Sequence, residues 1–237
     1  MVQPSQICAD PSIELLARGD FDGATLSHRS EGEILFEANQ PAHDVFFVQS
    51  GQVRLYHSIE SSAERLVNVL GGGSWLGIAA IAAAPSFGMR AQVFDRSMIW
   101  TVPATVFLDV LSRTPRLAST VISQMAVSLL NSYHSATRMM AWDCDSRIVQ
   151  ALLDLSTSAA AVPQVDGVSL RITHQELADA VGAARETVTT ALKALKREDV
   201  LKTKRNCLSF NPKILSQFGQ LRSQKSEPER EASKPSE

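Results

Sequence analysis

The stretch SLRITHQELADAVGAARETVTTALKALKREDVLKTKRNCLSFNP, Ser169–Pro212, decides how the C-terminal part of the chain folds. Thr173 and Glu176 stand three residues apart, a spacing that predicts a capping box at a helix start. A short helix is expected over Gln175–Val181. Gly182 follows it, and only a residue without Cβ adopts left-handed dihedral angles at little cost. The stretch therefore predicts a helix that ends in a tight turn.

A second helix is expected from Arg185 to about Glu198, because apolar residues recur there at three- and four-residue spacing. The side chains expected to pack between the two helices are Leu177, Ala178, Val181, Val188, Ala191, Leu192 and Leu195. An α-helix fits the major groove of DNA, and the outward residues of this one are of types that contact bases and phosphates. Arg185 is expected to donate two hydrogen bonds to guanine, and Glu186 to accept one from cytosine N4.

Beyond the second helix, the strands Val200–Thr203 and Leu208–Phe210 are expected to form a two-stranded wing with a basic tip, Lys204–Asn206, suited to phosphate contact. Residues 164–213 contain nine cations and six anions, in a chain whose net charge is −2. Positive charge is therefore concentrated on this segment. The residues expected to contact DNA are Thr173, Gln175, Arg185, Glu186, Thr189, Thr190, Lys193, Arg197 and Lys204. Thr189 and Thr190 are expected to touch a thymine methyl or a phosphate. On the pattern alone, a two-helix module that docks on a protein remains an alternative.

Short runs rich in Val, Ile, Phe and Leu alternate with turn residues in the N-terminal half: EILF, VFFVQ, QVRLYHS and RLVNVL. Such spacing predicts an antiparallel β-roll over residues 31–112, after a lead-in, residues 1–30, with a short helix at 12–18. The run GGGSWLGIAAIAAAPSFG, residues 71–88, is expected to be a turn, a short helix and a loop.

After Pro103 the apolar residues recur at helical spacing. A short helix is expected at Thr105–Ser112, and the segment 113–142 is expected to contain a long helix that begins at Pro115. Its apolar and small residues form a stripe along roughly 38 Å. The stripe consists of Val121, Ile122, Met125, Leu129, Ser132, Tyr133, Ala136, Met139 and Met140. It predicts a parallel helix pair across a two-fold axis, and hence a homodimer. Packing of the stripe on the chain's own β-roll is the alternative.

A hinge is expected at Trp142–Asp145, and the DNA-binding domain at 143–215. Arg147–Leu155 is expected to be the first helix of that domain, and residues 159–163 a loop. A last short helix is expected at Ile214–Leu221. The tail has no apolar periodicity, and residues 216–237 are assigned to a disordered tail.

Composition narrows the class of protein. No apolar run approaches the about 20 residues that span a bilayer, and the N-terminus lacks the basic-then-apolar order of a signal peptide, so we expect no membrane partner and a cytoplasmic location. Cys8, Cys144 and Cys207 are too far apart in sequence for a disulfide framework or a zinc site, and we expect no metal. No catalytic residue is expected, because neither a nucleotide-binding glycine motif nor an ordered set of nucleophile, base and carboxylate is present.

These motifs resemble the cyclic-AMP receptor protein/FNR (Crp/Fnr) family of bacterial transcription regulators over roughly residues 30–212. The C-terminal match is I-T-x-Q-E-L-A at Ile172–Ala178, Gly182, R-E-T-V at Arg185–Val188 and K-x-L at Lys193–Leu195. The N-terminal match is Gly32-Glu33-x-Leu35-Phe36, the Gly51 turn after Phe47-Val48, and A-x-x-x-D-x-S-x-x-W-x-V-P at Ala91–Pro103.

The resemblance implies an α+β chain with an N-terminal jelly roll like cyclic-nucleotide-binding domains, a long dimerisation helix and a C-terminal winged helix-turn-helix. It also implies an activator that binds palindromic double-stranded DNA as a homodimer and contacts RNA polymerase. Most members place arginine where Thr190 stands, so the half-site is expected to differ from theirs.

The effector pocket departs from the family pattern. Its cyclic-nucleotide binders carry a Gly-Glu pair and an Arg-Ser/Thr-Ala, whereas this chain has Leu76-Gly77-Ile78 and Met89-Arg90-Ala91. The one-residue shift sends the arginine to the opposite face of a strand unless a bulge restores it. The pocket is expected to be degenerate and to comprise Gly77, Ile78, Met89, Arg90 and Ala91.

The sequence has few residues that could bind an iron–sulfur cluster or a haem. Cys8 and Cys144 are too few for an iron–sulfur cluster, and a haem would have to use His57, His134 or Cys8. We expect no cofactor, and either no effector or an unidentified small molecule. A cyclic-nucleotide- or haem-dependent sensor that acts through a protein partner is the alternative.

Overall fold

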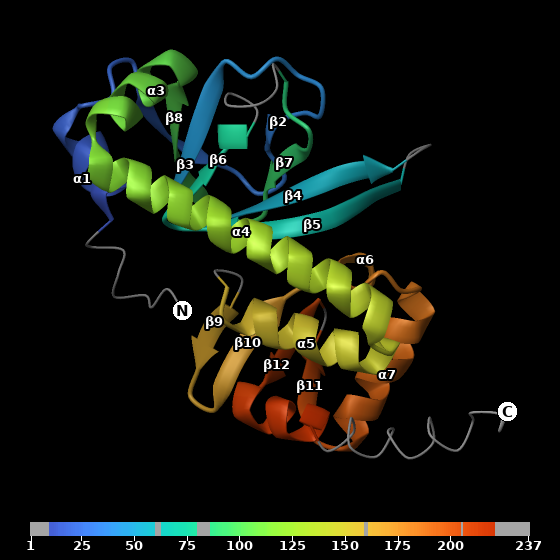
Figure 1. Ribbon diagram of the computed structural model, residues 1–237. Coiled ribbons are helices and arrows are strands. Elements are labelled where there is room, and N and C mark those ends of the chain that lie inside the picture. Colours follow the sequence, from blue (N-terminus) through green and yellow to red (C-terminus); the bar gives the residue numbers. More distant parts are fainter. Residues whose placement is uncertain (1–9, 60–62, 80–85, 159–160, 205, 221–237) are drawn as a thin grey trace, which may run out of the picture. The chain divides into compact units, whose positions relative to one another are not determined.

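The computed structural model describes residues 10–59, 63–79, 86–158, 161–204 and 206–220 (Figure 1). The chain forms two compact units, Met1–His134 and Ser135–Glu237. Most of the expected helix after Gly77 falls on residues 80–85, outside the described residues. None of the described helices is both long and apolar enough to cross a membrane.

The first unit is the predicted β-roll, built from two four-stranded antiparallel sheets, with the short helix α1, Pro11–Arg18, before it. One sheet has the order β1 (Thr25–Arg29), β8 (Ser97–Pro103), β3 (Asp44–Ser50) and β6 (Ser74–Leu76). The other has the order β2 (Ile34–Phe36), β7 (Arg90–Val93), β4 (Gln52–Ile59) and β5 (Ala63–Gly71).

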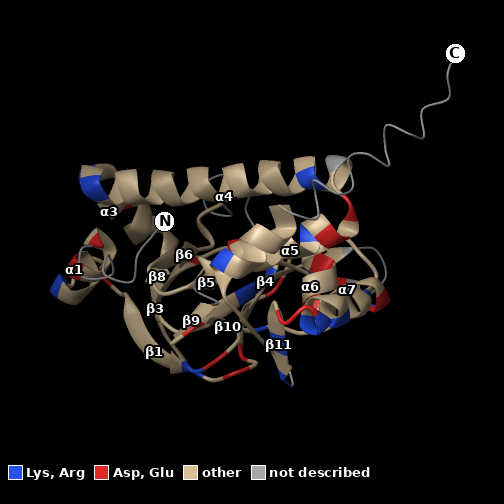
Figure 2. Ribbon diagram, turned by 90° about the horizontal axis from the view of Figure 1, so that it is seen from below, with Lys and Arg blue, Asp and Glu red and all other residues tan. Residues whose placement is uncertain are grey.

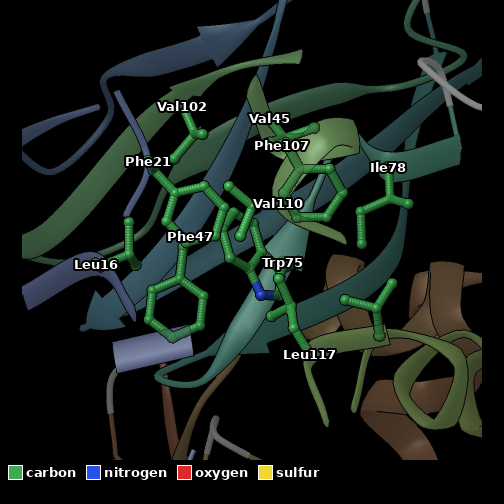
Figure 3. Close-up of a cluster of buried hydrophobic side chains, with 11 residues drawn as sticks. Leu16, Phe21, Val45, Phe47, Trp75, Ile78, Val102, Phe107, Val110 and Leu117 are labelled. Atoms are coloured by element: carbon green, nitrogen blue, oxygen red, sulfur yellow. The ribbon is translucent and has the colours of Figure 1, made fainter. Parts of the chain in front are cut away.

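The strand β3 is buried on both faces, which explains its uninterrupted apolar run. Val45 and Phe47 point to a cluster that also holds Trp75 and Phe107 (Figure 3). Phe46 and Val48 belong to a second cluster, which contains residues of both sheets. The roll thus has two apolar layers, one between its sheets and one between a sheet and the helices.

Two strands of the roll were not predicted. The expected turn at residues 74–76 is wrong, because β6 pairs with β3 there. Trp75 and Leu76 enter different core clusters, so this strand has no polar face and therefore no alternating pattern. The edge strand β1 is mostly exposed and is held by its pairing with β8.

The predicted long helix is α4, Pro115–Ala141, preceded by α3, Ala104–Arg113. Leu117 and Val121 pack in the first cluster. One turn further on, the side-chain amide of Gln124 donates to the carbonyl of Trp75 at 2.8 Å and accepts from its backbone N–H at 3.1 Å. The start of α4 is thereby attached to β6.

Most of the predicted stripe on α4 is exposed. Val121 is buried against the roll, but the large residues beyond it are not covered in the single chain. We use the name α4 stripe for these exposed residues: Ile122, Met125, Leu129, Tyr133, Met139 and Met140. Packing of the stripe on the chain's own roll is therefore limited to its first member.

The second unit contains α5 (Cys144–Ser156), α6 (His174–Val181), α7 (Arg185–Arg197) and a four-stranded antiparallel sheet. The sheet has the order β11 (Leu201–Lys204), β12 (Cys207–Phe210), β10 (Gly167–Arg171) and β9 (Ala161–Gln164). The predicted wing strands are present, but they are half of a larger sheet.

Three predicted boundaries in this unit are wrong. The loop expected at 159–163 is largely β9, an edge strand in which Pro163 is tolerated because one side of its backbone needs no partner. The break expected at Trp142–Asp145 is limited to Trp142 and Asp143, because α4 ends at Ala141 and Cys144 and Asp145 form the first turn of α5. Residues 212–220 are helical, so the disordered tail does not begin at 216.

Candidate nucleic-acid interface

The start of α6 is the predicted capping box. The backbone N–H of Glu176 donates to Thr173 Oγ1 at 3.1 Å, and the N–H of Thr173 donates to Glu176 Oε2 at 2.8 Å. The Thr173 hydroxyl also donates to that carboxylate at 2.9 Å. Both ends of the motif are therefore engaged, and the first helix has a defined start.

We expect Thr173→Ala to lower the free energy of unfolding of the second unit by about 1 kcal/mol, because the cap for the Glu176 N–H is lost. Denaturant titration, followed by a helix signal, measures the change. Thr187→Ala is the matched control, since Thr187 is exposed on α7 and outside the cap. Equal effects of the two substitutions would contradict a stabilising role for the capping box.

The turn between the helices has the predicted glycine in a left-handed conformation, with Gly182 at φ 62° and ψ 47°. Ala178 and Val188 are fully buried beside it, and the other residues predicted to lie between the helices are buried as well. A small residue on α6 and a branched one on α7 thus let the two helices approach closely.

The outward face of α7 carries the predicted contact residues. Arg185 and Glu186 lie in its first turn and are exposed, as are Lys193 and Arg197. The side chains expected to read bases therefore stand at the N-terminal end of the second helix, the part that enters the major groove in helix-turn-helix proteins.

Thr189 and Thr190, on this face, each donate their hydroxyl proton to a carbonyl of the same helix. Thr189 Oγ1 donates to the Arg185 carbonyl at 2.8 Å, and Thr190 Oγ1 donates to the Glu186 carbonyl at 3.0 Å. A threonine hydroxyl has a single proton, so neither can also donate to a phosphate in this geometry. Of the two predicted roles, the arrangement favours contact of their methyl groups with thymine.

His174, the first residue of α6, is not among the residues predicted from the sequence. Its Nδ1 lies 2.9 Å from Thr189 Oγ1 and joins the two helices on the outward side. Its neighbour Gln175, a predicted phosphate contact, donates one of its two side-chain amide protons to Asp179 at 2.8 Å. No local pattern could have revealed the histidine contact, because it joins residues in different helices.

The wing extends this surface. Lys204 is exposed and pairs with Cys207 across the hairpin. Asn206 has φ 52°, which suits an asparagine in a tight turn. Lys and Arg segments mark α7 and β11 in Figure 2.

Two domain matches identify the family. A Crp-like helix-turn-helix domain matches residues 146–218, and a cyclic nucleotide-binding domain matches residues 27–114. The chain belongs to the Crp/Fnr family. It is a transcription regulator with a helix-turn-helix DNA-binding domain and a domain of the cyclic nucleotide-binding type.

Curated relatives of this Crp/Fnr chain cover most of its length. The global nitrogen regulator of Synechococcus elongatus is 28% identical over 191 residues, 78% of this chain and 86% of the relative. The cAMP-activated global transcriptional regulator CRP of Haemophilus influenzae is 24% identical over 171 residues, 70% of this chain and 75% of the relative. The fold is similar to that of the c-di-GMP-responsive regulator CLP of Xanthomonas campestris, with a TM-score of 0.71, 21% identity, and coverage of 85% of this chain and 98% of that one.

In the cyclic-nucleotide-binding domain of this Crp/Fnr chain, Arg90 and Ala91 lie on opposite faces of β7. Ala91 is fully buried and pairs with Leu55, while Arg90 pairs with Tyr56 in the neighbouring register position. The register shifts fall between Ile34 and Phe36 and between β4 and β5, so the alternation of β7 is intact. No bulge therefore brings Arg90 to the inner face.

The Arg90 guanidinium is engaged on that outer face. It forms an ion pair with Glu64 of β5 and lies 4.9 Å from the centre of the Tyr56 ring. A cation in this position has both a carboxylate and an aromatic face as partners. The arginine is thus held by the sheet that carries it.

The other positions of the expected pocket contact the core. Ile78 is buried in the first cluster, and Met89 is half-buried. Gly77 has φ 85°, and a Cβ there would lie 3.0 Å from the Phe87 ring. Phe87 in turn stacks on Phe36 with ring centroids 3.9 Å apart. Aromatic side chains therefore occupy the space beside Gly77.

Proposed function

We propose that the chain binds palindromic promoter DNA as a homodimer and contacts RNA polymerase, with an effector pocket that has lost the family's nucleotide contacts. The observation that carries the DNA-binding proposal is the exposed first turn of α7, where Arg185 and Glu186 stand free of the core. Membership of a family of transcription regulators supports it.

Each DNA contact has a stated role. Arg185 donates to guanine O6 and N7, and Glu186 accepts from cytosine N4. Thr189 and Thr190 contact thymine methyl groups. The proposed phosphate contacts are Gln175, Lys193, Arg197 and Lys204, and Thr173 contributes through the helix start that it caps. Because Thr190 is short and uncharged, the half-site differs from that of members with arginine at this position.

The α4 stripe supports the dimer. Six large apolar side chains exposed along one helix are costly in water, and a second copy of the same helix would cover them across a two-fold axis. Two copies of α7 related by that axis would read the two halves of a palindrome.

Selection of duplexes from a random-sequence pool, with the mass of the complex from light scattering, tests the proposal. We expect a two-fold symmetric site bound by two chains. Recovery of no preferred sequence, with the chain instead retained by a protein partner, would favour the alternative that the C-terminal domain is a docking module.

The effector proposal has a separate test. The relatives from Haemophilus and Xanthomonas are named as cAMP-activated and c-di-GMP-responsive, but Arg90 here faces away from the inner layer of the roll. Calorimetric titration with cyclic AMP, cyclic GMP and cyclic di-GMP is expected to give no heat of binding, and the purified protein no haem absorption. Saturable binding of any of them would overturn the degenerate pocket.

We expect Lys204→Ala to weaken binding to all duplexes alike and to lower the slope of log affinity against log salt by about one, because one phosphate contact is lost. Gel-shift titrations at several salt concentrations measure this slope. Lys213→Ala removes the same charge from an exposed position outside the predicted set and is the matched control. A sequence-dependent loss for Lys204→Ala would contradict a phosphate role.

A further inference from the structure

The end of α4 is bound to α5 by an ion pair. Arg138 Nη2 lies 2.8 Å from Asp154 Oδ2, and it also donates to Ser135 Oγ at 3.2 Å. The other carboxylate oxygen of Asp154 accepts from the Gln150 side chain at 2.8 Å. Only 20% of the Arg138 side chain is exposed, so solvent screens this pair less than a pair on the open surface. The two helices are therefore held together at a defined point.

The same part of α4 also contacts the turn of the helix-turn-helix. A Cβ at Gly182 would lie 3.3 Å from Met139 Cε and 3.7 Å from Met139 Sδ, so the Met139 side chain packs on the Gly182 backbone. Arg147 of α5 lies near the same point, with its Nη1 at 4.0 Å. Two consecutive residues of α4 thus contact two different parts of the DNA-binding domain.

The connection between α4 and α5 consists of Trp142 and Asp143. The Trp142 N–H donates to the Arg138 carbonyl at 3.0 Å, and Asp143 caps α5 by accepting from the Ser146 N–H at 2.8 Å. Two residues still leave the angle between the helices open, because a few dihedral angles can redirect the second helix. The contacts of Arg138 and Met139 select one of these angles.

The angle at this junction matters because α4 carries both the proposed subunit contact and the DNA-binding domain. In the homodimer proposed above, the α4 stripe pairs the two helices, and the end of each α4 holds one copy of α7. The half-sites of a helix-turn-helix dimer lie about 34 Å apart, and one added base pair moves a half-site by roughly 3.4 Å and turns it by about 35°. A domain fixed to α4 cannot follow this shift without breaking its contacts.

We propose that Arg138 is a positioning residue whose ion pair with Asp154 sets the half-site spacing that the dimer accepts. Met139, packed on Gly182, supports the same angle. The proposal rests on the DNA-binding homodimer proposed above and adds a determinant of its spacing specificity. Neither Arg138 nor Met139 needs to touch DNA, because each acts through the angle between α4 and the DNA-binding domain.

The unsubstituted chain should discriminate between spacings, and Arg138→Gln should do so much less. With one base pair inserted between the half-sites or removed, the unsubstituted dimer should lose affinity about tenfold or more, because the second half-site is engaged poorly. Arg138→Gln lacks the charge that holds Asp154 and should lose less than about threefold. Its affinity for a duplex with a single half-site should equal that of the unsubstituted chain, since α7 is unchanged.

Gel-shift titrations of the full chain measure this preference on the selected palindrome, on versions with one base pair more or fewer at the centre, and on a single half-site. Asp154→Asn removes the other partner and should give the same loss of preference, and the double variant should be no worse than either single variant. Arg138→Lys restores a cation and should recover part of the preference. Arg113→Gln breaks an exposed ion pair with Asp109 in α3, at 3.2 Å, and is the matched control that should keep the full preference.

Light scattering and thermal unfolding verify that each variant is a folded dimer, and Asp154→Asn tests the proposal if Arg138→Gln does not fold. A full spacing preference in Arg138→Gln and Asp154→Asn overturns the role of the ion pair while leaving DNA binding intact. A uniform loss on all duplexes, the single half-site included, also overturns it, as does equal binding of all spacings by the unsubstituted chain. Failure of the unsubstituted chain to select any site overturns the proposed function and this inference together.

Discussion

Leu129→Glu is expected to convert the protein to single chains at micromolar concentration and to lower its affinity for a palindromic site by about a hundredfold or more. Leu129 lies in the middle of the α4 stripe, and 53% of its surface is exposed in the single chain. In a helix pair, the new carboxylate would be buried without a partner. Loss of the pair removes the simultaneous binding of two half-sites.

Val127→Glu is the matched control. Val127 is exposed to a similar extent, 57%, and lies on the same helix. Two residues correspond to about 200° around a helix, so the two side chains point in nearly opposite directions. Light scattering should therefore give a dimer for Val127→Glu and a monomer for Leu129→Glu. If the Leu129→Glu variant is still a dimer, the contact between the subunits lies outside the α4 stripe.

Arg185→Ala is expected to cost about 1–3 kcal/mol of binding free energy at the selected site, which is roughly a five- to 150-fold loss, and to relax the choice of base at one position of each half-site. The side chain is exposed in the first turn of α7 and has no role in the core. Gel-shift titration against the selected site and its single-base variants measures both effects.

The substitution Arg185→Lys tests base recognition separately from positive charge. Lysine keeps the positive charge but lacks the planar fork that matches two guanine acceptors, so affinity for unrelated duplexes should change little while base preference is lost. An equal loss for all sequences with Arg185→Ala would instead assign Arg185 to the phosphate backbone.

The helix-turn-helix could be predicted closely because its signals are local. Thr173 and Glu176 are within one turn of each other, Gly182 marks a left-handed residue, and the buried side chains recur at helical spacing. The exposed face follows from the buried one. The candidate DNA contacts on α7 could thus be named from the sequence.

The missed features depend on residues distant in the chain. Residues 74–76 become a strand because β3 supplies its partner, and β9 forms because β10 does so at the other edge of the wing sheet. The partners of Arg90 and of His174 likewise come from other elements. Tertiary pairing decided these positions, and local pattern carries little information about it.

The attachment of Gln124 to Trp75 has a consequence for solubility. The strand β6 ends its sheet, so its outer backbone groups would otherwise be available to a strand of another molecule. The amide of Gln124 satisfies one donor and one acceptor at the centre of this three-residue strand. A single side chain of α4 thereby occupies the two central backbone groups that a strand of another molecule would need in order to pair with this edge.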